Sequence, residues 1–90
     1  MDMQRVVIVA HGDVQRVGFR DAVQKMGRDL GLSGTVENQE PYDVAIVAEG
    51  DEATIQAFIA GLRIQKGPIQ VHDLEVRWEK ATGEFPYLRS

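Results

Sequence analysis

The chain has 90 residues and a mass of 10.0 kDa, the size of one domain. Its net charge of −4 argues against bulk electrostatic attraction to nucleic acid or to an anionic membrane. The lack of Cys excludes disulfides, thiolate nucleophiles and Cys-based zinc sites, and two isolated His residues cannot build a His-rich metal site. Because no apolar run approaches the ~20 residues that span a bilayer and no signal peptide is recognisable, we expect one cytoplasmic domain over residues 1–90.

The first half of the chain predicts a strand, a helix and a second strand. Residues 5–11 are an apolar run, bounded by Gly12, that is typical of a buried strand. Over residues 19–30 apolar side chains recur at i, i+3, i+4 and i+7, which predicts an amphipathic helix. Gly31 ends this helix as a C-terminal cap. Residues 33–38 then predict a short strand.

The second half predicts a strand, a helix and a long strand. Pro41 is placed in a turn because it cannot donate to a sheet, and residues 42–49 form the strand that follows. A second helix begins at Asp51 and again shows apolar spacing at i, i+3, i+4 and i+7. Residues 69–79 alternate between a packed face and a charged, solvated face. The members of the packed face are Leu74, Val76 and Trp78.

The order of strand, helix, strand, strand, helix and strand predicts an α+β fold. Two helices on one face of an antiparallel sheet bury two apolar stripes with few elements. This arrangement is the ferredoxin-like βαββαβ sandwich. The tail, residues 83–90, has the alternation expected of an additional short edge strand.

The connection between the first strand and the first helix, Gly12-Asp-Val-Gln-Arg-Val-Gly-Phe-Arg20, carries the most informative chemistry. A glycine-bearing loop that enters a helix presents unpaired backbone N–H groups and the positive end of the helix dipole, which together bind anions. Arg20 lies in the first helical turn, where the dipole disfavours a cation, so it is better explained as a ligand for an anion. The alternative is that the glycines only permit a turn and that Arg20 is a solvated charge. The loop matches neither the P-loop nor the dinucleotide pattern.

Two motifs resemble those of the acylphosphatase family. The segment Gly12-x-Val14-Gln15-x-Val17-Gly18-Phe19-Arg20 resembles the signature loop of that family. The segment Gly34-Thr-Val36-Glu-Asn38, followed by Val44 and Gly50, resembles its second signature. The resemblance spans nearly the whole chain and includes both predicted helices.

The resemblance implies a hydrolase that cleaves acyl phosphates, which are carboxyl–phosphate anhydrides, to a carboxylate and phosphate. It implies that the backbone amides of a loop cradle the phosphate, that Arg20 clamps the phosphate oxygens and that Asn38 orients the attacking water. It implies no metal and no organic cofactor. These roles suit an activated substrate, because positioning and charge stabilisation suffice and an amide both donates and accepts at any pH. The loop residues with the binding role are Gln15, Arg16, Val17, Gly18 and Phe19.

Two residues depart from the family pattern. Arg16 and Tyr42 both stand where the family more often has Gly. If position 16 requires a positive φ, Arg is strained there, and the activity is then reduced or altered. If the loop keeps its shape, Arg16 instead supplies a second cation near the substrate.

Other polar and aromatic residues have structural explanations. Without the family resemblance, Asn38 reads as a turn-former before the proline. His11 is expected to be a partly exposed residue at the end of a strand with no catalytic role. Trp78 is expected in the core. Three carboxylates around Asn38 are expected to be solvated turn charges: Glu37, Glu40 and Asp43.

The residues alone leave other functional classes open. The main alternative is a non-catalytic phosphate- or anion-binding module, since ferredoxin-like folds host many functions, and a small-ligand regulatory domain is a second. RNA binding is disfavoured because the predicted central strands mainly offer Val, Ile and Ala where bases would need aromatic side chains, and because the charge is acidic. A role within a larger carbamoyl-phosphate-processing system is disfavoured by the short chain. We expect a monomer whose partners are a small acyl phosphate and phosphate, with no nucleic acid and no membrane.

Overall fold

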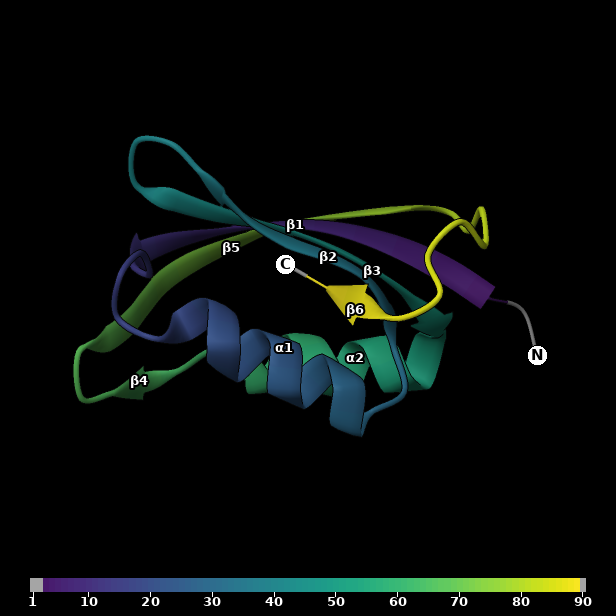
Figure 1. Cartoon of the computed structure of the whole chain (residues 1–90), viewed down its shortest axis with the longest axis horizontal. Coiled ribbons are helices and arrows are strands. Elements are labelled where there is room, and N and C mark those ends of the chain that lie inside the picture. The colour runs from purple at the N-terminus through teal and green to yellow at the C-terminus, as the bar shows by residue number, and fades with distance from the viewer. Residues whose placement is uncertain (1–2, 90) are drawn as a thin grey trace.

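A computed structural model describes residues 3–89 of the protein and shows one sheet with two helices against one face (Figure 1). The apolar segments predicted from the sequence form the sheet and the helices in the predicted order. Two short strands are added to that order. In chain order the elements are β1 Met3–Asp13, α1 Phe19–Asp29, β2 Ser33–Gln39, β3 Asp43–Asp51, α2 Glu52–Gly61, β4 Gln65–Lys66, β5 Ile69–Lys80 and β6 Leu88–Arg89.

The sheet has the order β4-β5-β1-β3-β2-β6, which confirms the ferredoxin-like α+β fold. β1 pairs antiparallel with β3 and β5, and β2 pairs antiparallel with β3. β6 confirms the edge strand expected in the tail and pairs parallel with β2, while Ser90 lies outside the described residues. β4 was not predicted, because two residues cannot display an alternating pattern.

The core lies between the sheet and the helices. On β1, Val6, Ile8 and Ala10 face the helices and are fully buried, whereas Val7 and Val9 on the other face of the predicted apolar run are only partly buried. Phe19 from α1 and Phe58 from α2 are also fully buried. Burial of each Val, Ile or Phe side chain stabilises the fold by about 1.5–3 kcal/mol relative to leaving that side chain exposed.

The far half of β5 corrects one prediction. Val76 and Trp78 lie opposite Ile8 and Val6 in the register, yet their exposed fractions are 37% and 38%. The helices pack mainly on β1, β2, β3 and β6, and β4 extends the sheet past only the first residues of β5. Trp78 is therefore an edge residue and not a core residue, because alternation assigns a face but not whether a helix covers it.

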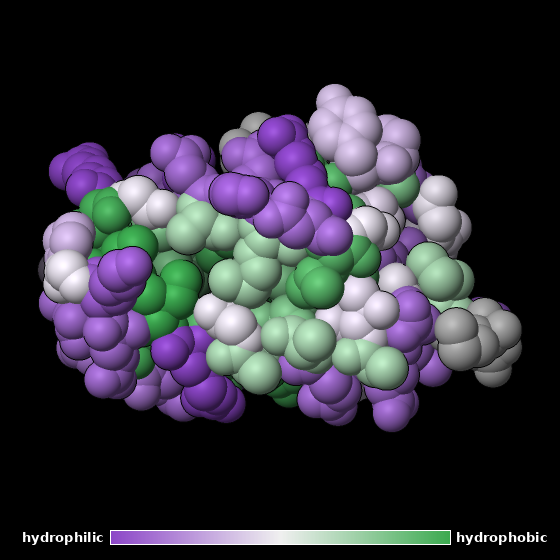
Figure 2. Space-filling model, turned by 90° about the horizontal axis from the view of Figure 1, so that it is seen from below, coloured by the Kyte–Doolittle hydropathy of each residue, from purple (hydrophilic) through white to green (hydrophobic). Residues whose placement is uncertain are grey.

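The two helices differ in their outer surfaces. α1 is amphipathic, and its C-terminus is closed by hydrogen bonds from Gly31 N to Arg28 O and from Leu32 N to Gly27 O. α2 begins at Asp51, whose carboxylate accepts from Thr54 N. Exposed small apolar residues continue round α2, so the helix face of the molecule carries an apolar area bordered by hydrophilic side chains (Figure 2). These residues are Ala53, Ala57 and Ala60.

One carboxylate, that of Glu49, is buried at the end of the sheet where β1 begins. It accepts hydrogen bonds from Arg5 Nε at 2.7 Å and from the backbone N–H groups of Thr82 and Gly83. Burial alone would raise the pKa of Glu49, but these donors outweigh it and lower the pKa. Glu49 therefore ties the segment before β6 to the sheet, at the end opposite the loop between β1 and α1.

No helix within residues 3–89 is both long and apolar enough to cross a membrane.

Candidate active site

Three connections meet at one end of the sheet (Figure 1). They are the β1–α1 loop, the β2–β3 turn and the β4–β5 turn. β1 and β2 are both antiparallel to β3, which lies between them, so β1 and β2 run in the same direction. Their C-terminal ends therefore lie at the same end of the sheet, where α1 begins. The topology thus brings the predicted loop and Asn38, near the end of β2, to one end of the molecule.

The loop is fixed by its two ends and by one side chain. Val14 and Phe19 are buried in the core and anchor the ends of the loop. Between them, Gln15 Nε2 donates to the backbone carbonyl of Asp43 at 2.8 Å. This bond ties the loop to the first residue of β3. The side chain of Gln15 thus has a structural partner, whereas its backbone N–H has none within residues 3–89.

Two glycines give the loop its path. Gly12 lies at a bulge in β1 with φ +131, and a Cβ there would be 2.1 Å from the carbonyl oxygen of Gln70. Only glycine permits this close approach of β5. Gly18 is the N-cap of α1 with φ 88, and no side chain caps the helix there. The first turn of α1 therefore keeps its N–H groups free of any acceptor within residues 3–89.

The amides of the loop form a surface of unpaired hydrogen-bond donors. Within residues 3–89, none of the backbone N–H groups of residues 15–20 donates to a backbone or side-chain acceptor. Unpaired donors at a helix N-terminus attract negative charge, and the helix dipole adds to their field. An oxyanion with several acceptor oxygens would satisfy them.

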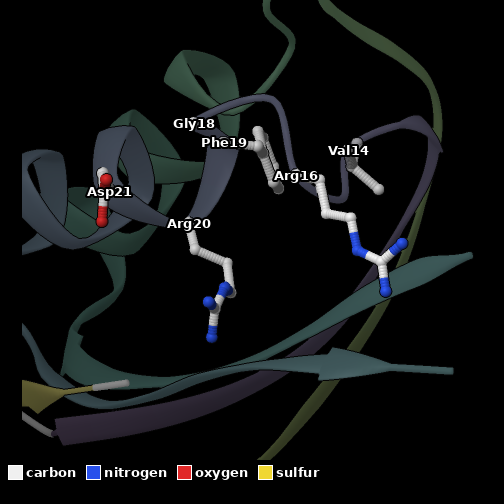
Figure 3. Close-up of a pocket in the computed structure, with 6 residues that line it drawn as sticks. All are labelled: Val14, Arg16, Gly18, Phe19, Arg20 and Asp21. Carbon is white, nitrogen blue, oxygen red and sulfur yellow. The ribbon is translucent and has the colours of Figure 1, made fainter.

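Two arginines add full charges to this surface. Arg16 and Arg20 line a cavity of about 190 Å³ together with Val14, Gly18 and Phe19. Figure 3 shows both guanidinium groups extending toward the strands, while Asp21, which also lines the cavity, lies apart from them. In the described part of the chain, no carboxylate pairs with either arginine. Both cations are therefore available to an anion, despite the acidic net charge.

The two departures from the family pattern differ in their backbone. Among the described non-glycine residues, Arg16 alone has a positive φ, at 61. This conformation costs an L-residue about 1–2 kcal/mol. Tyr42 lies in the β2–β3 turn, not in the strand where the sequence placed it, and its φ is not positive. Position 16 therefore favours glycine, whereas position 42 accepts a side chain without strain.

Replacing Arg16 with Gly is expected to raise the free energy of unfolding by up to about 1 kcal/mol. Glycine relieves the left-handed strain, and its greater freedom in the unfolded chain offsets part of that gain. Urea unfolding of the two proteins measures the difference. A large gain in kcat in the same variant would show that Arg16 impairs the site, whereas a loss would show that its charge assists. An unfolding midpoint of Arg16→Gly at a lower urea concentration than that of the wild type would show that the backbone at Arg16 is not strained.

Asn38 lies near the end of β2, at the same end of the sheet as the loop, on the helix-facing side. In β2, Gly34 and Val36 are buried on that face, and Asn38 continues the alternation beyond the core. It is exposed, pairs in register with Val44, and has no hydrogen-bonding side-chain partner among residues 3–89. The side-chain amide of Asn38 therefore has free donors and a free acceptor within residues 3–89. It lies on the helix-facing side of the sheet, and Arg20 extends from α1 toward the sheet in Figure 3.

His11 forms a polar cluster on the opposite face of the sheet. Its Nδ1 lies 3.0 Å from Asp43 Oδ1 and its Nε2 lies 3.1 Å from Glu75 Oε1. The hydrogen bond to Asp43 raises the pKa of His11 above its ordinary 6.5; partial burial opposes this, and Glu75 reinforces it. Asp43 is thus an ion-pair partner that also holds Gln15, not the solvated charge expected from the sequence. Sequence alone did not reveal this link, because it depends on the pairing of three strands.

The stability that His11 contributes is expected to fall as the pH rises. A raised folded pKa means that this contribution is complete below about pH 6.5 and is lost as the pH passes through the folded value. The difference in unfolding free energy between the wild type and His11→Gln should therefore be larger at pH 5.5 than at pH 8.5. Urea unfolding at the two pH values measures it. A difference that grows with pH would show that the neutral imidazole is the preferred form.

Together, the fold and the loop define an α+β domain of the ferredoxin-like class with a row of unpaired amides between β1 and α1. The family model of acylphosphatase matches residues 6–88, and the chain therefore belongs to the acylphosphatase family of hydrolytic enzymes.

Individual relatives agree with this assignment. An acylphosphatase of Roseiflexus sp. strain RS-1 is 37% identical over 84 residues, which cover 93% of this chain and 90% of that protein. The crystal structure of the acylphosphatase from Bacillus subtilis has a TM-score of 0.90 at 29% identity and covers 96% of each chain. The structure of HypF from T. kodakarensis is also similar, with a TM-score of 0.81 at 32% identity; the match covers 96% of this chain and 11% of that one.

Proposed function

We propose that this protein hydrolyses the carboxyl–phosphate bond of acyl phosphates in the cavity lined by the β1–α1 loop and the first turn of α1. The observation that carries the proposal is the row of amides at residues 15–20 that have no acceptor within residues 3–89, beside an arginine that pairs with no carboxylate of those residues. Family membership supports the same reaction.

In this proposal the phosphate binds to the loop amides and to Arg20. The guanidinium fork matches two phosphate oxygens, and the amides hold the others. Negative charge on these oxygens is stabilised by fixed donors that need no rearrangement during the reaction. Arg16 lines the same cavity and supplies a second positive charge.

Asn38 holds the attacking water in this proposal. Its amide oxygen accepts a hydrogen bond from the water, which directs an oxygen lone pair at the phosphorus. A bond forms between the water oxygen and phosphorus, and the bond to the acyl oxygen breaks. The carboxylate leaves with the bonding electron pair, and a proton of the water remains with the phosphate or passes to solvent. Because a carboxylate is a good leaving group, orientation and charge stabilisation carry most of the catalysis.

The activity is tested by hydrolysis of benzoyl phosphate with purified protein, without added metal and again with a chelator. The Arg20→Ala variant serves as the blank against spontaneous breakdown. Chelator-resistant turnover that is lost in the variant is the expected result. If phosphate binds but no turnover exceeds the blank, the protein is instead a phosphate-binding module.

We also propose that residues 1–90 act as a single acylphosphatase-like domain, as a monomer in the cytoplasm, without binding nucleic acid. The net charge of −4 supports the last point, because a nucleic-acid interface requires a surplus of cations. Light scattering coupled to size-exclusion chromatography tests the monomer. A mass near 20 kDa, about twice that of the 10.0 kDa chain, would show a dimer.

A further inference from the structure

A second hollow lies directly beside the phosphate cavity. Its volume is about 370 Å³, and it shares Val14 and Arg16 with that cavity. The remaining walls come from the loop and from both neighbouring turns, through Val17, Pro41, Tyr42 and Pro68 among others. The three connections that meet at this end of the sheet in Figure 1 thus border it.

The walls of this hollow include the rings of one tyrosine and two prolines, and these rings are exposed in the described structure. Tyr42 is 74% exposed, and Pro41 and Pro68 are exposed as well. No hydrogen bond within residues 3–89 engages Tyr42, and its backbone conformation is ordinary. A flat apolar ligand would cover this surface and release its water.

The covalent structure of an acyl phosphate places its acyl group directly beside its phosphate, as the second hollow lies directly beside the phosphate cavity. One oxygen joins the phosphorus to the acyl carbon, so the acyl group must begin immediately outside the space that holds the phosphate. Arg16, which lines both hollows, marks that boundary. Asp13 also lines the second hollow, and its carboxylate disfavours a negatively charged acyl group.

We propose that this second hollow binds the acyl group of the substrate, and that Tyr42 gives the enzyme a preference for uncharged aromatic acyl phosphates. The proposal deepens the proposed function and rests on it. Tyr42 is a specificity-determining residue here, because it contacts the acyl ring and takes no part in the phosphate chemistry.

The test compares benzoyl phosphate with acetyl phosphate as substrates of the wild type, Tyr42→Ala and Tyr42→Phe. Tyr42→Ala is expected to raise KM for benzoyl phosphate about five- to tenfold, with kcat unchanged. KM for acetyl phosphate and competitive inhibition by inorganic phosphate should change less than about twofold, because a methyl group offers the Tyr42 ring little surface and inorganic phosphate has no acyl group. Tyr42→Phe keeps the aromatic ring and should retain the preference.

Tyr87→Ala is the matched control, since Tyr87 is an exposed tyrosine in the tail near Gly34, at the other end of β2. It should alter neither KM. Equal effects of Tyr42→Ala on both substrates, or no effect on either, would overturn the acyl hollow while leaving the hydrolase intact. If the wild type hydrolyses neither substrate, the proposed function fails and the acyl hollow fails with it.

Discussion

Arg20→Ala is expected to lower kcat/KM for benzoyl phosphate by about 10³-fold, because it removes the charge that the substrate's phosphate meets in the cavity. The loop amides remain and account for residual binding. Arg20 is exposed and has no carboxylate partner in the described structure, so the free energy of unfolding should change by less than about 0.5 kcal/mol. Steady-state kinetics and inhibition by inorganic phosphate give the two readouts, and both should weaken.

Two variants separate the geometry of Arg20 from its charge. Arg20→Lys keeps the charge without the planar fork and should recover only part of the rate. Lys25→Ala removes a cation from the exposed side of the same helix, where Lys25 pairs with Asp29, and should leave the kinetics unchanged. If Arg20→Ala retained wild-type inhibition by phosphate, the phosphate would have to bind elsewhere.

The residues beside the cavity explain why, in the proposed function, the loop would bind phosphate through its backbone rather than through many side chains. Val14 and Phe19 are buried, and Gln15 is bound to Asp43, so three of the loop side chains hold its shape. The amides are then fixed before any ligand arrives, and little order is lost on binding. In this arrangement three side chains hold the shape of the loop, and Arg20, in the first turn of α1, can bind the phosphate of the substrate.

The sequence was sufficient for those features that depend on local periodicity. β1 and α1 follow from an apolar run and from helical spacing, and Asp51 caps α2 through a local bond to Thr54. The family motifs located the loop and Asn38, and the sheet topology explains why they share one end.

Features that depend on lateral neighbours were beyond the sequence. The exposure of Trp78 depends on how far the helices extend over the sheet, and the pairing of His11 with Asp43 depends on strand register. The hollow beside Tyr42 requires three connections to converge, and no single segment encodes that. From the sequence, strain at Arg16 could be predicted only if position 16 has a positive φ, because a sequence shows the residue and not its φ.

Asn38→Ala is expected to lower kcat by about 10²–10³-fold while inhibition by inorganic phosphate stays within about twofold of the wild type. Asn38 holds the water in the proposed mechanism and does not hold the phosphate, so turnover and binding should separate. Exposure at the end of β2 predicts a small change in the free energy of unfolding, which urea unfolding checks.

The controls for Asn38 test the amide itself. Asn38→Asp retains the size but offers only acceptors and a negative charge beside the bound phosphate, so it should not restore the rate. Gln39→Ala removes the neighbouring amide, which alternation places on the other face of the sheet, and should leave kcat unchanged. Wild-type turnover in Asn38→Ala would remove Asn38 from the mechanism and leave the loop and Arg20 to position the water. Weaker phosphate inhibition in that variant would instead make Asn38 part of the phosphate site, since a residue that only orients water cannot alter the affinity for the product.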